Sequence, residues 1–275
     1  MKKEVVLLTG AGQIGMAIAR RIGYGKKIIV GDKKQENAEC ISEMMNAVGY
    51  DTVPCKVDIS LRTSILEMIE VAQGFGDISM LINAAGVSPS QASIEAILAV
   101  DLYGTAVLLE EVGKVIRWGG TGVTISSQSG HRLPALGEET DCLLATTPTE
   151  ELLSLDILRK ENIRDSLHAY QLAKRCNVKR VMAEAVKWGT RKARVNSISP
   201  GIIVTPLAMD ELNGERGAFY KNMFAKCPAG RPGIPDEVAD VAELLMSERA
   251  GFITGADFLI DGGATASFFY GPLKP

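Results

Sequence analysis

The sequence predicts an α/β fold, a single domain with a doubly wound, mostly parallel seven-stranded sheet and helices on both faces. Short apolar runs alternate with amphipathic helical patterns along the whole chain, as expected for such a sheet. The runs are apolar on both faces, which is typical of buried parallel strands. A length of 275 residues fits one large domain with a sizeable core.

The predicted elements follow one another without an internal repeat or a low-complexity segment. Strands are expected at Glu4–Thr9, Lys27–Gly31, Thr52–Val57, Met80–Asn83, Gly122–Ser126, Arg194–Ile198 and Phe258–Ile260. Helices are expected at Ile14–Ile22, Gln35–Val48, Leu61–Gln73, Ile94–Trp118, Leu167–Lys187 and Pro235–Met246.

The composition excludes several classes of protein. With 46% hydrophobic and 23% charged residues it is that of an ordinary soluble chain. A net charge of −3 gives no reason to expect nucleic acid or an anionic membrane as partner. No apolar stretch approaches the roughly 20 residues that span a bilayer. Five scattered cysteines and two histidines indicate neither a disulfide framework nor a metal site, so we expect a cytoplasmic protein.

A glycine-rich turn, Thr9-Gly-Ala-Gly-Gln-Ile-Gly15, follows the first strand and opens the first helix. Its first glycine permits the turn, the second lets backbone approach a pyrophosphate, and the third allows close helix–strand packing. The helix N-terminus supplies N–H groups to phosphates. A plain tight turn is the alternative, but the context favours a dinucleotide site. The residues assigned to it are Gly10, Gly12, Gln13, Ile14 and Gly15.

Asp32 ends the second strand, about 20 residues past the loop, where an acidic residue takes the ribose hydroxyls of a dinucleotide. Its charge would repel a 2′-phosphate, so NAD is favoured over NADP. Lys33 and Lys34 follow at once. They are either a surface cluster or neutralise a 2′-phosphate, which keeps NADP as the alternative.

Two further strand ends are assigned to the cofactor. Asp58, followed by Ile59, is placed to accept from the adenine amino group, although a helix N-cap suits it nearly as well. The small residues of Asn83-Ala84-Ala85-Gly86 suit close approach of backbone to a ligand. A plain turn explains them almost equally well.

The segment His131–Asp165 separates a strand from the next long helix with far more chain than a loop needs. It is rich in acidic residues and leucines, and Thr147-Pro148-Thr149-Glu150 has the pattern of a helix start. We therefore expect a small helical insertion. It is interpreted as a lid over a site, with a surface decoration as the alternative.

Tyr170 and Lys174 stand four apart, which places both side chains on one face of a helix. A neighbouring ammonium favours the phenolate, and a phenol whose pKa is lowered from about 10 becomes a usable acid or base. Taken alone, such a pair is more often a solvated surface contact.

The motifs occur in a specific order. They are Thr9-Gly-x-Gly-x-x-Gly15, Asp32, Asp58, Asn83-Ala-Ala-Gly86, Ile125-Ser-Ser127, Tyr170-x-x-x-Lys174, Arg194-Val-Asn-x-Ile-x-Pro-Gly201 and Asp261-Gly-Gly263. This ordered set resembles the short-chain dehydrogenase/reductase family, of the single-domain Rossmann type. The resemblance covers roughly Glu4 to Ala264.

The resemblance implies a catalytic group. Tyr170 would be the proton donor or acceptor for the substrate oxygen, and Lys174 would lower the tyrosine pKa and hold the nicotinamide ribose. Ser127 would hydrogen-bond the substrate carbonyl. The nicotinamide would be lined by Pro200, Gly201, Ile203 and Thr205.

The chain departs from the family pattern at three places. The glycine loop is one residue tighter than usual. Asp101 stands where the family usually has asparagine in the proton-relay helix, and it is assigned to the catalytic group. Its backbone carbonyl would hold the relay water on Lys174, and its carboxylate would add a charge partner. The long segment before Tyr170 is an insertion.

The family also implies assembly, since Ile94–Trp118 and Leu167–Lys187 resemble its dimer-forming helices. A homodimer or homotetramer is therefore expected. In the tail, residues 265–275, we expect Phe268, Phe269 and Tyr270 to be buried on their own or a neighbouring subunit.

The expected function is NAD(P)(H)-dependent interconversion of a secondary alcohol and a ketone. The leucines of the insertion favour a bulky, apolar, hydroxysteroid-like small molecule. A polyol or sugar is the competing substrate class. A dinucleotide-binding sensor or scaffold without catalysis is the rival class of function.

Overall fold

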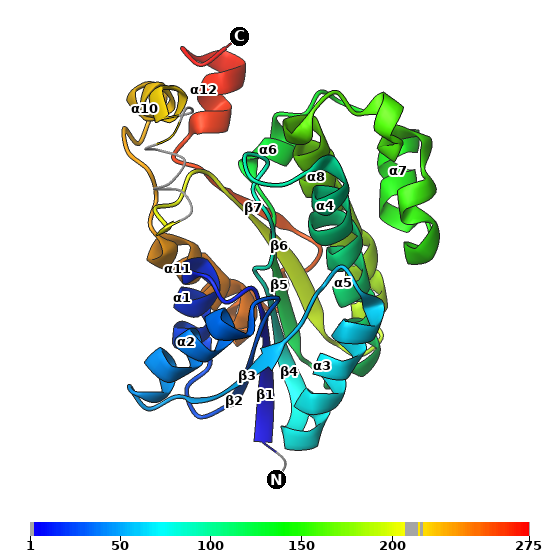
Figure 1. Cartoon of the computed structure of the whole chain (residues 1–275), viewed down its shortest axis with the longest axis vertical. Coiled ribbons are helices and arrows are strands. Elements are labelled where there is room, and N and C mark those ends of the chain that lie inside the picture. Colours follow the sequence, from blue (N-terminus) through cyan, green and yellow to red (C-terminus); the bar gives the residue numbers. More distant parts are fainter. Residues whose placement is uncertain (1–2, 207–213, 215–216, 275) are drawn as a thin grey trace.

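The computed structural model describes residues 3–206, 214 and 217–274 (Figure 1). Its centre is one seven-stranded sheet with the order β3-β2-β1-β4-β5-β6-β7, in which every neighbouring pair is parallel. The strands are β1 (Lys3–Thr9), β2 (Lys27–Asp32), β3 (Asp51–Lys56), β4 (Gly76–Asn83), β5 (Thr121–Ile125), β6 (Arg194–Pro200) and β7 (Asp257–Ile260). The predicted Rossmann-type fold is confirmed, with all strands parallel.

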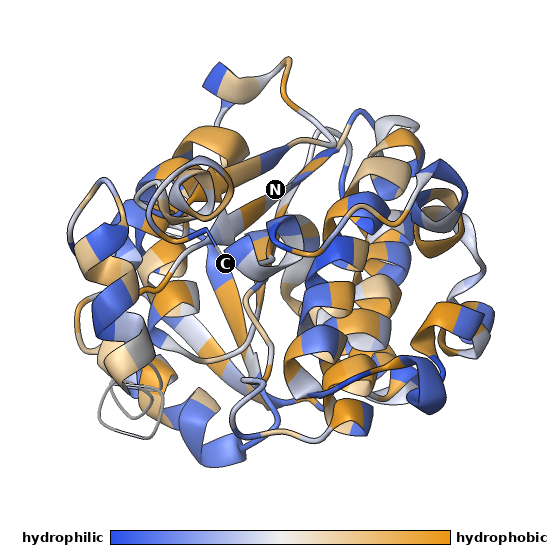
Figure 2. Ribbon diagram, turned by 90° about the horizontal axis from the view of Figure 1, so that it is seen from above, coloured by the Kyte–Doolittle hydropathy of each residue, from blue (hydrophilic) through white to orange (hydrophobic). Residues whose placement is uncertain are grey.

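Two helical layers enclose the sheet (Figures 1 and 2). Alternate residues of β1 show why, since Val5 and Leu7 enter one apolar cluster and Val6 and Leu8 enter the other. One face carries α1 (Gln13–Ile22), α2 (Gln35–Asn46) and α11 (Pro235–Met246). The other carries α3 (Arg62–Phe75), α5 (Thr105–Val115) and α8 (Ser166–Gly189). Within the described residues, no helix is long and apolar enough to cross a membrane.

The helix predicted at Ile94–Trp118 is divided. It begins as α4 (Ile94–Ile97), continues as the π-helix η1 (Leu98–Gly104) and ends as α5 at Val115. A Cβ on Gly104 would lie 2.5 Å from the carbonyl oxygen of Ile59, so only glycine lets the helix approach this chain so closely. Single-turn π-helices often mark functional sites, and Asp101 lies within this one.

The predicted insertion is helical. After α6 (Gln128–His131) come α7 (Glu138–Thr146) and the 3₁₀ helices η2 (Thr149–Ser154), η3 (Asp156–Leu158) and η4 (Lys160–Asn162). The helix start predicted at Thr147 is wrong in detail, because no side chain caps η2. The Thr149 hydroxyl donates instead to Glu110 Oε2 at 2.6 Å.

The leucines of the insertion form a third apolar cluster. Leu144, Leu152 and Leu158 are buried there with Leu172 and Cys176 of α8. The segment therefore packs against the side of α8. Arg175 of that helix also donates to Asp141 of α7 at 2.9 Å.

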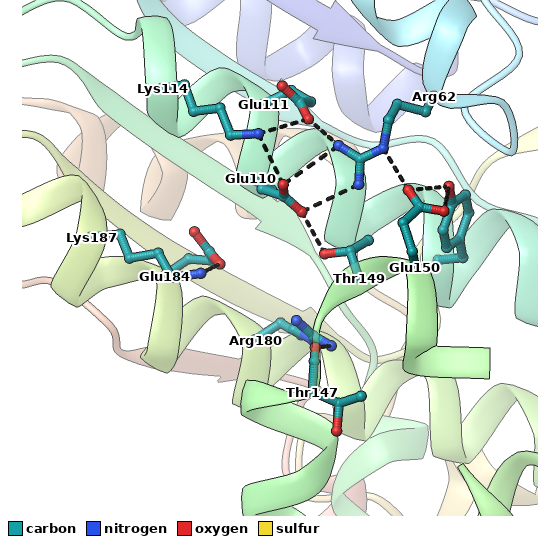
Figure 3. A network of polar contacts seen from close by, with 11 residues as sticks. Arg62, Glu110, Glu111, Lys114, Thr147, Thr149, Glu150, Arg180, Glu184 and Lys187 are labelled. Atoms are coloured by element: carbon teal, nitrogen blue, oxygen red, sulfur yellow. Dashed lines mark hydrogen bonds and ion pairs between the residues drawn. The ribbon is translucent and has the colours of Figure 1, made fainter. Parts of the chain in front are cut away.

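A charged network fixes η2 to the body of the protein (Figure 3). Arg62 of α3 pairs with Glu150 at 2.6 Å, with Glu110 at 3.3 Å and with Glu111. Lys114 pairs with both Glu110 and Glu111 at 2.9 Å. Burial opposes ionisation of Glu110, but hydrogen bonds from Thr149, Lys114 and Arg62 hold its pKa at about 2.

This network predicts an acid-sensitive contribution to stability. The folded-state pKa of Glu110 lies below its ordinary value of 4.5, so the contribution is present above about pH 4.5 and lost as pH falls towards 2. We expect Glu110→Gln to lower the free energy of unfolding by roughly 1–3 kcal/mol near pH 7. The loss should shrink at pH 3, as measured by urea unfolding. Glu151→Gln, on an exposed side chain of η2, is the control and should change neither value.

Candidate active site

The carboxyl ends of β4, β5 and β6 open onto a cavity of about 400 Å³. Its walls are Ala84–Val87 after β4, Ile125–Ser129 after β5 and Pro200–Ile203 at the end of β6, together with Tyr170 and Lys174 of α8. In a doubly wound sheet, this edge beside the switch in strand order is where ligands bind. The strand order places that switch between β1 and β4.

The glycine loop reaches this edge between β1 and α1. Gly10 has φ +85°, and a Cβ there would lie 2.5 Å from the backbone nitrogen of Ala85. A Cβ on Gly15 would lie 2.7 Å from the carbonyl oxygen of Gly10. A Cβ on Gly12 would meet no atom within 4 Å beyond its chain neighbours, so the turn leaves open space on that side, where a phosphate would approach. Ile14 lines the cavity, whereas Gln13 lines a neighbouring hollow.

Asp32 lies against the glycine loop, as its predicted role requires. Its Oδ2 accepts from the backbone N–H of Ala11 at 2.9 Å. Its Oδ1 accepts from Lys34 N at 2.9 Å and from Asn37 Nδ2 at 3.3 Å. The carboxylate is thus held at the carboxyl end of β2 beside the turn.

Asp58 is paired with Lys33 at 2.7 Å, and its Oδ1 accepts from the backbone and hydroxyl of Ser60. Burial opposes its ionisation, but these hydrogen bonds and the Lys33 charge hold the pKa of Asp58 below its ordinary value. The alternative of a helix N-cap is wrong, since Leu61 is the N-cap of α3 and no side chain caps that helix. Ile59 is buried in the core.

The side chain of Asn83 is directed into the fold. Its Oδ1 accepts from the Thr9 hydroxyl at 3.0 Å, and its Nδ2 donates to the Thr105 hydroxyl at 3.3 Å. These bonds tie β1, β4 and α5 together, so Asn83 shapes the edge of the site, while Ala84 and Gly86 line the cavity.

Ser127, Tyr170 and Lys174 line one cavity. Ser127 is the N-cap of α6, and its Oγ accepts from Ser129 N at 3.1 Å. The Lys174 ammonium lies 5.3 Å from the centroid of the Tyr170 ring. Because Lys174 is only 4% exposed, the alternative of a solvated surface pair is wrong.

Lys174 makes a buried ion pair with Asp101. The Nζ–Oδ1 distance is 3.1 Å, and Asp101 is fully buried. The Asp101 carboxylate also accepts from Val87 N at 3.3 Å with each oxygen. Gly86 leaves the room for this pair, since a Cβ there would lie 2.6 Å from Asp101 Oδ1.

Burial sets the protonation of the pair. Burial raises the pKa of Asp101, and the Lys174 charge offsets this only in part. Burial alone would lower the pKa of Lys174, but the charges of Asp101 and Tyr170 outweigh it and raise that pKa. Lys174 is therefore held as a cation beside the phenol of Tyr170.

The lid predicted over the site is not found where the leucines lie. Of residues 131–165, all of which the structure describes, only Arg132 lines the cavity. The remaining predicted residues Pro200, Gly201, Ile203 and Thr205 do line it.

Other cavity residues were not predicted from the sequence. They include Gln128 and Arg132 from the region of α6, Tyr220 and Met223 of α10 (Gly217–Lys226) and Phe268 of α12 (Ala264–Tyr270). Within the single chain, Phe269 is 43% and Tyr270 92% exposed, so burial of these two on their own subunit is wrong, and burial on a neighbouring subunit stays a prediction. Phe268 alone reaches the site.

Comparisons with known proteins agree with this geometry. The model of the family described as short chain dehydrogenase matches residues 4–137, and that described as enoyl-(acyl carrier protein) reductase matches residues 141–265. The short-chain dehydrogenase/reductase bsc3 of Alternaria brassicicola is 37% identical over 267 residues, covering 97% of each chain.

Two further relatives extend the comparison. D-threitol dehydrogenase of Mycolicibacterium smegmatis is 30% identical, over 95% of this chain and 93% of its own. The solved structure of levodione reductase, 24% identical, has a TM-score of 0.77 over 97% of this chain and 99% of its own, which shows the shared fold. On these grounds the chain belongs to the short-chain dehydrogenase/reductase family of oxidoreductases.

Proposed function

We propose that the protein interconverts a secondary alcohol and a ketone, with a nicotinamide dinucleotide as cofactor. The observation that carries the proposal is the cavity in which Tyr170, buried Lys174 and Ser127 meet beside the glycine loop. The open space at Gly12 and the position of Asp32 fit a dinucleotide. When bound, the nicotinamide supplies or accepts the hydride.

The residues of the chain handle the proton and the charge. A carbonyl that receives hydride develops negative charge on oxygen, and the hydroxyls of Ser127 and Tyr170 are donors for that oxygen. Tyr170 then delivers the proton. Lys174, kept cationic in a buried setting, stabilises the phenolate that remains.

NAD is the favoured cofactor. The Asp32 carboxylate lies beside the loop, and the charge of Lys33 is already paired with Asp58. A 2′-phosphate would therefore meet the Asp32 carboxylate, with Lys34 as the lysine of the pair left to offset it. NADP is the alternative.

The preference for NAD is testable by removing one charge. We expect Asp32→Asn, which keeps the shape and an acceptor for Ala11 N, to shift the ratio of kcat/KM for NAD⁺ to that for NADP⁺ towards NADP⁺ by about tenfold or more. Glu36→Gln, an exposed carboxylate in the first turn of α2, is the matched control. An unchanged ratio in Asp32→Asn would remove Asp32 from cofactor selection.

The substrate class is a separate question. Leu144, Leu152 and Leu158 are buried against α8, while Leu143 and Leu153 are exposed. None of the leucines of the insertion lines the cavity, so they no longer argue for a hydroxysteroid-like molecule. A polyol or sugar gains support from the name of the D-threitol relative. A panel of ketones with NADH and of alcohols with NAD⁺ tests the proposed reaction. Cofactor binding without turnover across the panel would favour the sensor or scaffold instead.

A homo-oligomer is also proposed. The insertion covers one side of α8, while Met182 and Val186 on that helix are 51% and 76% exposed. A subunit contact through α5 and α8 would use this remaining apolar surface. Light scattering of the whole chain tests it, since a monomer at micromolar concentration would contradict the proposal.

A further inference from the structure

Arg132 enters the cavity from the same short element as Ser127. Ser127 is the N-cap of α6 and Arg132 is its C-cap. Both residues line the cavity that holds Tyr170 and Lys174. One turn of helix thus places a guanidinium in the chamber where the reacting oxygen would lie.

Within the residues that the structure describes, the contacts of this guanidinium are with neutral groups. Its Nη2 donates to Gln128 Oε1 at 2.8 Å, and Nη1 and Nη2 lie 3.8 Å from the Met223 sulfur. The Phe268 ring centroid is 5.4 Å from its Cζ. Its Nε is buried without a hydrogen-bond partner.

No carboxylate of residues 3–206, 214 and 217–274 lies within 4.0 Å of the Arg132 guanidinium. Asp261, which acts on Arg132 only through its charge, has both carboxylate oxygens engaged. They accept from Gly263 N at 2.9 Å and from Thr265 N at 2.6 Å. Burial accordingly lowers the pKa of Arg132, and the charge of Asp261 offsets this only in part.

Other arginines of the chain differ from Arg132 either in their partners or in their place. Arg62 and Arg175 are paired with carboxylates. Arg180 and Arg194 donate to backbone carbonyls, and neither lines the cavity. Arg132 is partly buried and has no carboxylate partner among the described residues. Withdrawing a charge from water without a counter-charge is costly, so the site gains from a ligand that brings an anion.

We propose that Arg132 binds an anionic oxyacid group of the substrate, so that the enzyme acts on a ketone or secondary alcohol carrying a carboxylate or a similar anion. This inference rests on the proposed function. The planar guanidinium presents donors in a fork that matches carboxylate oxygens. Gln128 and the Phe268 face orient the fork, while Met223 and Phe268 offer apolar contact to the body of the substrate.

The test uses matched pairs of neutral and anionic ketones. The probes are 4-oxopentanoate, 5-oxohexanoate and 6-oxoheptanoate, each beside its N-methyl amide, and 5-oxohexane-1-sulfonate as a tetrahedral anion. Binding to the NADH-loaded protein is measured by calorimetry, and turnover by NADH oxidation. For at least one length, we expect the wild type to bind the acid about 10–100-fold more tightly than its amide.

The variants separate charge from shape. Arg132→Met should remove the preference for the acid, and Arg132→Lys should retain part of it because the charge remains. Arg164→Met, an exposed arginine outside the cavity, changes the net charge equally and should keep the full preference. If circular dichroism shows that Arg132→Met does not fold, Arg132→Gln replaces it.

The outcomes distinguish this inference from the function on which it rests. The inference would be overturned if the wild type bound acid and amide with equal affinity at every length. It would also be overturned if the preference for the acid survived in Arg132→Met. Either result would count even if both ketones are reduced. Tight, Arg132-dependent binding of an acid without any turnover would support the inference and count against the proposed reaction. Tighter binding of the sulfonate than of the carboxylates would support the inference and identify a tetrahedral anion as the group that Arg132 prefers.

Discussion

Tyr170→Phe is expected to lower kcat by about a thousandfold or more while NADH binding is retained. The substitution keeps the aromatic ring on α8 and removes only the hydroxyl. The Tyr170 ring lies 5.3 Å from the buried Lys174 ammonium, which also makes an ion pair with Asp101. Ser127 would still donate to the substrate oxygen, but an alcohol is a far weaker acid than a phenol beside a cation.

The measurement is steady-state reduction of the best ketone found, with NADH affinity followed by its fluorescence. Tyr103→Phe is the matched control, since the Tyr103 hydroxyl donates to Glu150 at 3.0 Å in the charged network and does not line the cavity. The control should leave kcat near the wild-type value. A Tyr170→Phe enzyme with kcat within tenfold of the wild type would show that another group moves the proton.

Asp101→Ala is expected to lower the free energy of unfolding by about 3–5 kcal/mol, because it leaves the buried ammonium of Lys174 without its partner. Lys174 is 4% exposed, and the charge of Asp101 is a principal reason why its pKa is raised. Urea unfolding near pH 7 measures the loss. A change below about 1 kcal/mol would mean that the ion pair adds little to the stability of the fold.

Asp101→Asn separates charge from structure, since asparagine keeps the shape and an acceptor for Val87 N. The Asp101 charge opposes the phenolate of Tyr170, and removing it lets Lys174 act on the phenol without a counter-charge. In alcohol oxidation Tyr170 must accept the proton as a phenolate, so the acidic limb of the pH profile should move to lower pH. A limb that stays in place, or moves to higher pH, would contradict the assigned role of Asp101.

The fold was predictable because its signals are local. Val5–Leu8 form an apolar run, as expected of a buried strand. The structure has the glycine turn at the position predicted, between β1 and α1. The division of Ile94–Trp118 was not predictable, since the helical pattern continues through η1. Its cause is the close approach of Gly104 to Ile59, a tertiary contact.

The residues proposed as catalytic could be named from the ordered motifs, but their surroundings could not be predicted. The sequence shows that Asp101 replaces a usual asparagine, and only the fold shows its carboxylate 3.1 Å from Lys174. Likewise, Arg132 and Phe268 are far apart in the chain and meet only because α12 packs over the site. The signal that was available for Arg132 is its place a few residues after Ser127.

The leucines of the insertion show why composition alone misleads about a lid. A leucine-rich segment must bury its side chains, but composition does not say against what. Here Leu144, Leu152 and Leu158 pack on α8. The cavity is lined instead by residues such as Arg132 and Phe268.

The central claim is that this cavity transfers hydride between a nicotinamide and a secondary carbinol carbon. It is tested most directly by incubating the protein with NADH deuterated at C4, on each face in turn, and a panel of ketones that includes the keto acids. Mass spectrometry should find one deuterium on the carbinol carbon of a product, from one face only, and none with Tyr170→Phe. Bound NADH with no deuterium transferred to any ketone of the panel would contradict the account.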